Sequence, residues 1–73
     1  MKGRSSFSEG EASRIRLLLG EKMGQPRYEQ KRIRSNIRAL GFFISDFRES
    51  TRAFTAADFD SLVIEGRVTV GSP

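Results

Sequence analysis

Four basic residues recur at helical spacing in the middle of the chain: Arg27, Lys31, Arg34 and Arg38. At about 100° of helix rotation per residue, their side chains fall within one narrow arc. The row extends roughly 16 Å at a rise of about 1.5 Å per residue, which is long enough to meet several backbone phosphates of a nucleic acid. The chemistry that this pattern favours is therefore ion pairing with a polyanion.

Two features set this row apart from an ordinary solubilising helix face, which is the plain alternative. No acidic residue shares the arc, and the chain holds ten Arg against three Lys. A solubilising face mixes both signs of charge, whereas Arg makes paired contacts with phosphates and guanine edges. We interpret the row as a nucleic-acid-binding face, with duplex DNA as the expected partner. Other basic residues that would extend it are Arg14, Arg16, Lys22, Lys2 and Arg4.

The remaining residue types offer little catalytic or metal-binding chemistry. The chain has no Cys and no His, which excludes disulfides, thiolate or imidazole metal sites, cysteine nucleophiles and histidine bases. Its acidic residues show no calcium or magnesium loop spacing, and no glycine-rich phosphate loop or nucleophile motif is present. We therefore expect a non-enzymatic protein that needs no metal or cofactor.

The phenylalanines raise the possibility of stacking on single-stranded bases. A chain this short, which has no Trp, must bury most of its aromatic side chains to form a core. We therefore assign the five Phe between residues 42 and 59 to the core, and expect phosphate contact to dominate over stacking.

The length and charge of the chain indicate how many domains it forms, where it is located and which half faces a partner. Seventy-three residues make one small domain, and no apolar run is long enough for a membrane span or a signal peptide. We expect a soluble cytoplasmic protein that does not contact a membrane. Residues 1–38 carry a net charge of +6 and residues 39–73 a net charge of −2, so the first half should face a nucleic acid.

The first half of the chain is predicted to form a short arm followed by two helices. Residues 1–7 are polar and basic, which predicts a disordered arm. Ser8 followed by Glu11 matches a capping box that starts the first helix, and Leu17 lies off the apolar face of this helix. The residues predicted on the apolar face are Ala12, Ile15, Leu18, Leu19 and Met23.

A break at residues 24–26 separates this helix from the one that carries the basic row. The second helix is predicted over residues 27–40, with Gly41 as its C-terminal stop. Two helices joined so tightly should form a helical hairpin or a helix-turn-helix. The following residues, 42–47, are too short and too rich in β-formers to continue the helix, which predicts a strand.

The second half contains one more helix and one more strand. After a polar loop at residues 48–52, Thr55 and Asp58 form a second capping-box pattern, so a third helix should begin at Ala56. Gly66 should end it, and the alternation over residues 67–70 predicts a short strand. We expect the two predicted strands to pair with each other, in a direction that the sequence does not decide.

The resulting fold class is a small α+β domain of order α-α-β-α-β. Its expected boundaries are a disordered basic arm at 1–7, the domain at 8–70 and a frayed end at 71–73. A helix at residues 32–40 that passes through Gly41 directly into a strand resembles the recognition helix of a winged-helix module. The expected architecture is therefore helix-turn-helix-like or winged-helix-like.

Two other functional interpretations stay open. In one, the chain is a protein-interaction module or homodimer, and either its acidic, Phe-rich C-terminal half or the Leu17 surface binds a partner protein. In the other, the chain is a terminal fragment or a subunit of a larger enzyme.

Overall fold

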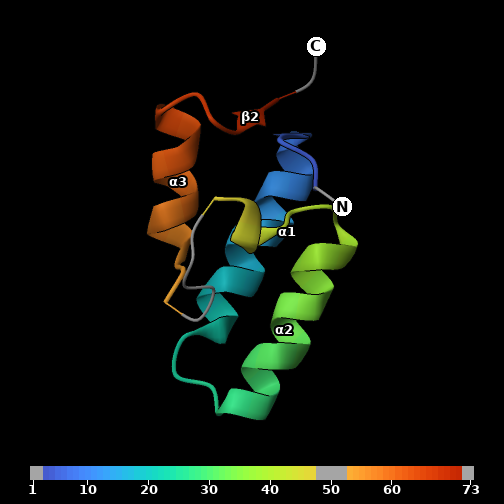
Figure 1. Ribbon diagram of the computed structural model, residues 1–73, viewed down its shortest axis with the longest axis vertical. Coiled ribbons are helices and arrows are strands. Elements are labelled where there is room, and N and C mark those ends of the chain that lie inside the picture. The colour runs from blue at the N-terminus through green and yellow to red at the C-terminus, as the bar shows by residue number, and fades with distance from the viewer. Residues whose placement is uncertain (1–2, 48–52, 72–73) are drawn as a thin grey trace.

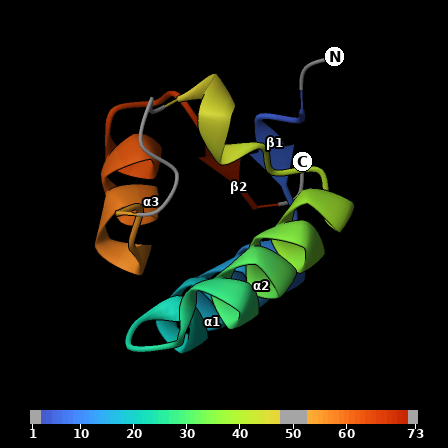
Figure 2. The same ribbon diagram turned by 60° about the horizontal axis from the view of Figure 1, so that its bottom comes forward.

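Helix α1 (Glu9–Lys22) packs against the two other helices, α2 (Arg27–Ala39) and α3 (Ala56–Ile64), and lies between them (Figure 1). The computed structural model describes residues 3–47 and 53–71. Helices α1 and α2 run side by side, whereas α3 lies apart from α2 (Figure 2). The described residues form a mixed α+β fold that is mostly helical. The elements are β1 (Ser6–Phe7), α1 (Glu9–Lys22), α2 (Arg27–Ala39), the 3₁₀ turn η1 (Ile44–Asp46), α3 (Ala56–Ile64) and β2 (Thr69–Val70).

Both predicted capping boxes form, which confirms the predicted starts of α1 and α3. The Glu11 amide donates to Ser8 Oγ at 3.1 Å, and the Ser8 amide donates to Glu11 Oε1 at 2.9 Å. In the same way, the Asp58 amide donates to Thr55 Oγ1 at 3.3 Å and the Thr55 amide to Asp58 Oδ2 at 3.0 Å. Each box satisfies two amides that the first turn of a helix leaves without backbone partners.

The C-terminal stop of α2 also lies where the sequence predicts it. Gly41 has a φ of +98°, a left-handed conformation that glycine adopts without the steric cost of a Cβ. The Gly41 amide donates to the Arg38 carbonyl at 2.9 Å, which satisfies one of the last carbonyls of the helix. The basic row is thus carried on a helix with a defined end.

The strand predicted over residues 42–47 is wrong. This segment contains η1 instead, in which the Asp46 amide donates to the Phe43 carbonyl at 3.0 Å and the Phe47 amide to the Ile44 carbonyl at 2.9 Å. Local 3₁₀ bonds satisfy the backbone here without a partner strand. The strand on which the winged-helix resemblance depends is therefore absent from residues 42–47.

The predicted strand pairing is wrong as well, because β2 pairs with β1. The two strands are parallel, with Ser6 opposite Thr69 and Phe7 opposite Val70. Part of the segment expected to be a disordered arm is thus ordered, and Phe7 is only 2% exposed. Burial of this aromatic ring stabilises the pairing of two strands that are each too short to be stable alone. Residues 1–2, 48–52 and 72–73 of the expected arm, loop and end lie outside the described residues.

One aromatic ring connects the N-terminal strand to the second half of the chain. The centroid of the Phe42 ring lies 5.8 Å from that of Phe7, 5.5 Å from Phe47, 5.8 Å from Phe54 and 5.1 Å from Phe59. Aromatic pairs at such distances add to the free energy of burial. Phe42 directly follows the stop of α2, so this core holds the C-terminal end of the basic helix in place.

The apolar face of α1 is confirmed except at its end. Ala12, Ile15, Leu18 and Leu19 are buried, but Met23 is 61% exposed and Lys22 is only 2% exposed. Helix α1 ends at Lys22, and Met23 has an extended backbone, so its side chain no longer follows the helix period that defines this face. Lys22 follows Leu18 by four residues and Ile15 by seven, so the helix period places it on the buried face.

Candidate nucleic-acid interface

Helix α2 holds the basic row beside its buried side. Ile33 and Ile37 pack into the core, and this burial fixes the rotation of the helix. Arg27, Lys31 and Arg38 are exposed, and Arg34 is half-buried. The predicted arc is therefore present at the surface of the folded chain.

The charges of this row have no acidic partners among the described residues. No ion pair in residues 3–47 and 53–71 involves Arg27, Lys31, Arg34 or Arg38. By contrast Arg32, on another side of the same helix, lies 3.8 Å from the Glu29 carboxylate. Cations without acidic neighbours keep their full attraction for an external anion, because no internal charge offsets it.

Part of the row forms one wall of a groove of about 340 Å³, which we call the α2–η1 groove. Its opposite wall comes from the segment that follows α2, and none of the described residues that line it is acidic. The Arg38 guanidinium carbon lies 4.8 Å from the centroid of the Phe43 ring, a cation–π contact that joins the two walls. The lining residues include Lys31, Arg34, Ser35 and Arg38 from α2, and Phe43 and Ser45 from the following segment.

Arg34 is the most constrained cation of the groove. Its Nη1 atom is buried and has no hydrogen-bond partner among the described residues. The pKa of Lys22 is lowered, first by burial of its ammonium group and then by the positive charge of Arg34, while Asp58 opposes the shift. Arg34 is therefore close enough to a second cation to be repelled by it.

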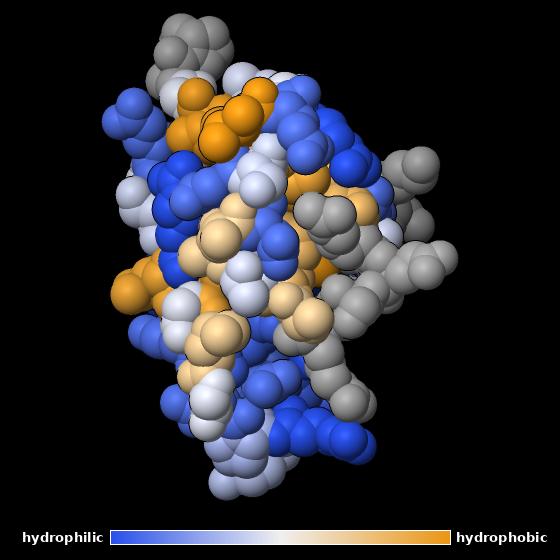
Figure 3. All heavy atoms as spheres, turned by 90° about the vertical axis from the view of Figure 1, so that its left-hand side faces the viewer, coloured by the Kyte–Doolittle hydropathy of each residue, from blue (hydrophilic) through white to orange (hydrophobic). Residues whose placement is uncertain are grey.

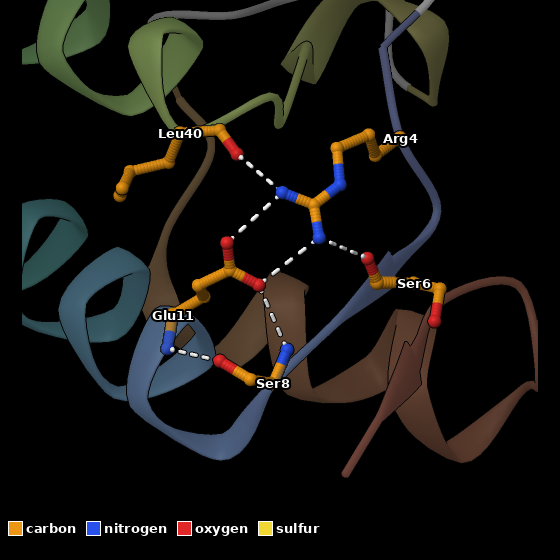
Figure 4. Close-up of polar contacts among 5 residues, drawn as sticks. All are labelled: Arg4, Ser6, Ser8, Glu11 and Leu40. Carbon is orange, nitrogen blue, oxygen red and sulfur yellow. Dashed lines mark hydrogen bonds and ion pairs between the residues drawn. The ribbon is translucent and has the colours of Figure 1, made fainter. Parts of the chain in front are cut away.

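Arg4, a predicted binding residue, instead makes internal contacts that we call the Arg4 clasp (Figure 4). Its Nη1 donates to Glu11 Oε2 at 2.9 Å and to the Leu40 carbonyl at 3.3 Å. Its Nη2 donates to Glu11 Oε1 at 3.0 Å and to the Ser6 carbonyl at 3.0 Å. The hydrogen bonds from Arg4 and from the Ser8 amide lower the pKa of Glu11 to about 2. The clasp joins β1, α1 and the end of α2.

The other predicted binding residues lie in different surroundings. The Arg16 Nε lies 2.7 Å from Asp60 Oδ1, and its guanidinium carbon lies 5.3 Å from the centroid of the Phe59 ring. Arg16 therefore links α1 to α3. Arg14 is exposed on α1, Lys22 is buried, and Lys2 lies outside the described residues.

Sequence reasoning missed four residues that line the groove, namely Ser35, Phe43, Ile44 and Ser45. Ser35 follows Lys31 by four residues on the same helix, so helical spacing was a signal for it. Phe43 and Ser45 reach the groove because the chain turns back at η1 after α2, and no local pattern encodes that approach.

Comparisons with known proteins found no relative of this chain. No protein-family model, no curated protein and no solved structure matches the chain. None of the helices in residues 3–47 and 53–71 combines the length and the apolar character needed to cross a membrane. Within the same residues, no group of three or more acidic side chains could hold a metal ion.

Proposed function

We propose that the protein binds nucleic acid, with duplex DNA as the expected form, through the basic face of α2, defined as Arg27, Lys31, Arg34 and Arg38. The observation that carries the proposal is the row itself: its four cations lie exposed or half-buried on one helix, and none of them makes an ion pair within the described residues. Each cation that meets a phosphate displaces a condensed counterion, and the entropy of that release favours binding. The protein would act without catalysis, as a regulator or accessory factor in the cytoplasm.

The helical pair α1–α2 supports this proposal by fixing the orientation of the basic face. Residues of α1 on its buried side pack against α2, so the cations are held on a rigid element rather than on a loop. In a helix-turn-helix-like arrangement, α2 would be the helix that contacts the nucleic acid and α1 the one that supports it.

Fluorescence anisotropy with labelled random-sequence duplex and single-stranded DNA, measured at two salt concentrations, tests the proposal. We expect at least micromolar affinity at low salt and a steep loss of affinity as the salt concentration rises. The double variant Lys31→Ala/Arg38→Ala should lower the slope of log K against log salt by about 1.8, because each phosphate that a cation neutralises adds about 0.9 to the slope. Stronger binding of the duplex would favour phosphate contact over base stacking.

A charge-matched control separates this face from net charge. The double variant Arg32→Ala/Arg67→Ala removes the same charge from side chains that lie beside acidic partners, Glu29 and Glu65. We expect it to keep nearly the full slope. Equal slopes for the two double variants, or no binding at low salt, would contradict the proposal.

Exposed apolar side chains favour a second candidate function, the binding of a partner protein or a second copy. Leu17 is 55% exposed and Ile64 is 85% exposed. On the face of the molecule that Figure 3 shows, however, the hydrophobic areas are separated by hydrophilic ones. A concentration-dependent dimer in size-exclusion chromatography that Leu17→Asp disrupts, together with no DNA binding, would favour this candidate.

A further inference from the structure

The α2–η1 groove has the size of a small-ligand site rather than that of a flat backbone-binding surface. Its volume of about 340 Å³ lies near the lower end of the range for such sites, roughly 300–1,000 Å³. An extended phosphodiester backbone can contact exposed cations along a helix, but a concave site admits a strand end more readily than a continuous strand. The shape of the groove therefore favours a compact ligand or a strand end, in addition to the backbone that exposed cations can bind.

The polar groups of the groove fit a phosphate group. Arg34 and Arg38 offer guanidinium groups, Lys31 an ammonium group, and Ser35 and Ser45 hydroxyl groups that donate hydrogen bonds. A terminal phosphate monoester carries a charge of about −1.5 to −2 at pH 7 and three acceptor oxygens, which is more than a phosphodiester offers. The groove thus favours the monoester by charge and by hydrogen-bond count.

Arg34, which lines the groove, has one hydrogen-bond donor that no described residue accepts from. Its Nη1 is buried without a partner among the described residues, an arrangement that costs free energy unless another group accepts the hydrogen bond. Arg34 itself lines the groove, so an anion bound there would lie beside the side chain that carries this donor.

The Phe43 side of the groove suits the nucleoside that carries the phosphate. The ring is half-buried and is held under the Arg38 guanidinium at 4.8 Å, so it forms a fixed apolar wall beside the cations. A sugar or base can pack on such a wall while its phosphate meets Arg34 and Lys31.

We infer that the α2–η1 groove binds the terminal phosphate monoester of a nucleic-acid strand. The inference rests on the proposed function, because Lys31, Arg34 and Arg38 of the basic face line the groove that would hold the strand end, which leaves Arg27 for the adjoining backbone. A free nucleoside monophosphate offers the same chemistry, and competition with the phosphorylated duplex distinguishes the two sources.

The test compares duplexes of one sequence that carry a 5′-phosphate, a 3′-phosphate or only hydroxyl ends. We expect one phosphorylated duplex to bind about tenfold more tightly than the hydroxyl-ended duplex, the equivalent of one added charge-assisted contact. Ser35→Leu should fill the groove without changing the charge, and should reduce this preference to about onefold. Ser13→Leu, the same substitution at an exposed position of α1, should leave the preference unchanged.

A second variant guards against misfolding of the first. Arg34→Gln keeps a long polar side chain but removes the guanidinium, and it should also abolish the preference. Thermal unfolding of each variant establishes that it is folded before its affinity is compared.

The possible outcomes distinguish failure of the strand-end inference from failure of the proposed function. Tight but equal binding of all three duplexes would overturn the inference and leave the proposed function standing, whereas no binding of any duplex would overturn both. A preference that survives both Ser35→Leu and Arg34→Gln would place the site elsewhere. Displacement of the phosphorylated duplex by an equal concentration of adenosine 5′-monophosphate would overturn the strand-end assignment in favour of a free nucleotide.

Discussion

The Arg4 clasp and the basic face of α2 use the same kind of side chain in opposite ways. The Arg4 guanidinium donates to one carboxylate and two carbonyls, whereas no ion pair among the described residues involves the cations of the α2 face. A satisfied guanidinium holds chain segments together, and one without an acidic neighbour remains available to an external anion. The role of an arginine in this protein therefore depends on whether a carboxylate lies beside it.

The two regions meet at the end of α2. The clasp includes the carbonyl of Leu40, one of the last carbonyls of the helix, and the cation thereby complements the negative end of the helix dipole. Next to it, the Arg4 amide donates to the Gly41 carbonyl at 2.7 Å. The clasp thus fixes the end of the helix that carries the binding face.

A substitution in the core that supports both regions should have the largest effect on the free energy of unfolding. Phe42→Ala removes a buried ring that contacts four other rings, and should lower the free energy of unfolding by about 3–5 kcal/mol. Urea denaturation followed by circular dichroism measures this. Ile64→Ala, at a position that is 85% exposed, is the control and should change stability by less than about 0.5 kcal/mol. Similar losses for the two variants would contradict the assigned core.

Ser8 beside the clasp and Ser35 in the groove should differ in how much each contributes to stability. Ser8→Ala removes a capping hydrogen bond beside the clasp, and should lower the free energy of unfolding by about 1 kcal/mol. Ser35→Ala, in the α2–η1 groove, removes no hydrogen bond of the described structure and should leave stability nearly unchanged. Urea midpoints of the two variants, measured side by side, check the difference. Equal midpoints would show that the capping box contributes nothing.

Acid should weaken the clasp but not the basic face. The pKa of Glu11 is about 2 in the folded chain, below its ordinary value of 4.5, so the folded state favours the ionised carboxylate. This contribution to stability is fully present above pH 4.5 and is lost as the pH falls toward 2. Glu11→Gln should flatten the dependence of the unfolding free energy on pH between about 5 and 2, as measured by urea denaturation at several pH values. An unchanged pH dependence would contradict the assigned ion pair.

The smallest effect on stability should come from the basic face itself. Lys31→Ala should change the free energy of unfolding by less than about 0.5 kcal/mol, because Lys31 is exposed and has no ion-pair partner among the described residues. The same variant should still reduce the salt slope of DNA binding by about 0.9. Denaturation and anisotropy on one protein preparation test both statements. A large loss of stability would show that this face is structural, like the clasp.

Short-range patterns predicted the helices and the basic row correctly. The capping boxes at Ser8 and Thr55 and the stop at Gly41 depend on residues within four positions of one another. Prediction failed at residues 42–47, where β-forming residues adopt a 3₁₀ turn, and at the pairing of β2. The pairing of β2 joins residues far apart in the chain, and β-propensity at residues 42–47 does not form a strand where local 3₁₀ hydrogen bonds satisfy the backbone instead.

The positions of α1, α2 and α3 along the chain could be predicted from the sequence alone, and so could the set of cations that share one arc of α2. Both properties follow from the helix period and from hydrogen bonds between residues close in the chain. The tertiary structure alone decided that β1 pairs with β2, that Arg4 binds Glu11 and Leu40, and that η1 closes a groove against α2. These contacts form when burial of Phe7 and Phe42 brings distant segments together, so the partner of each charged side chain depends on the packing of the whole chain.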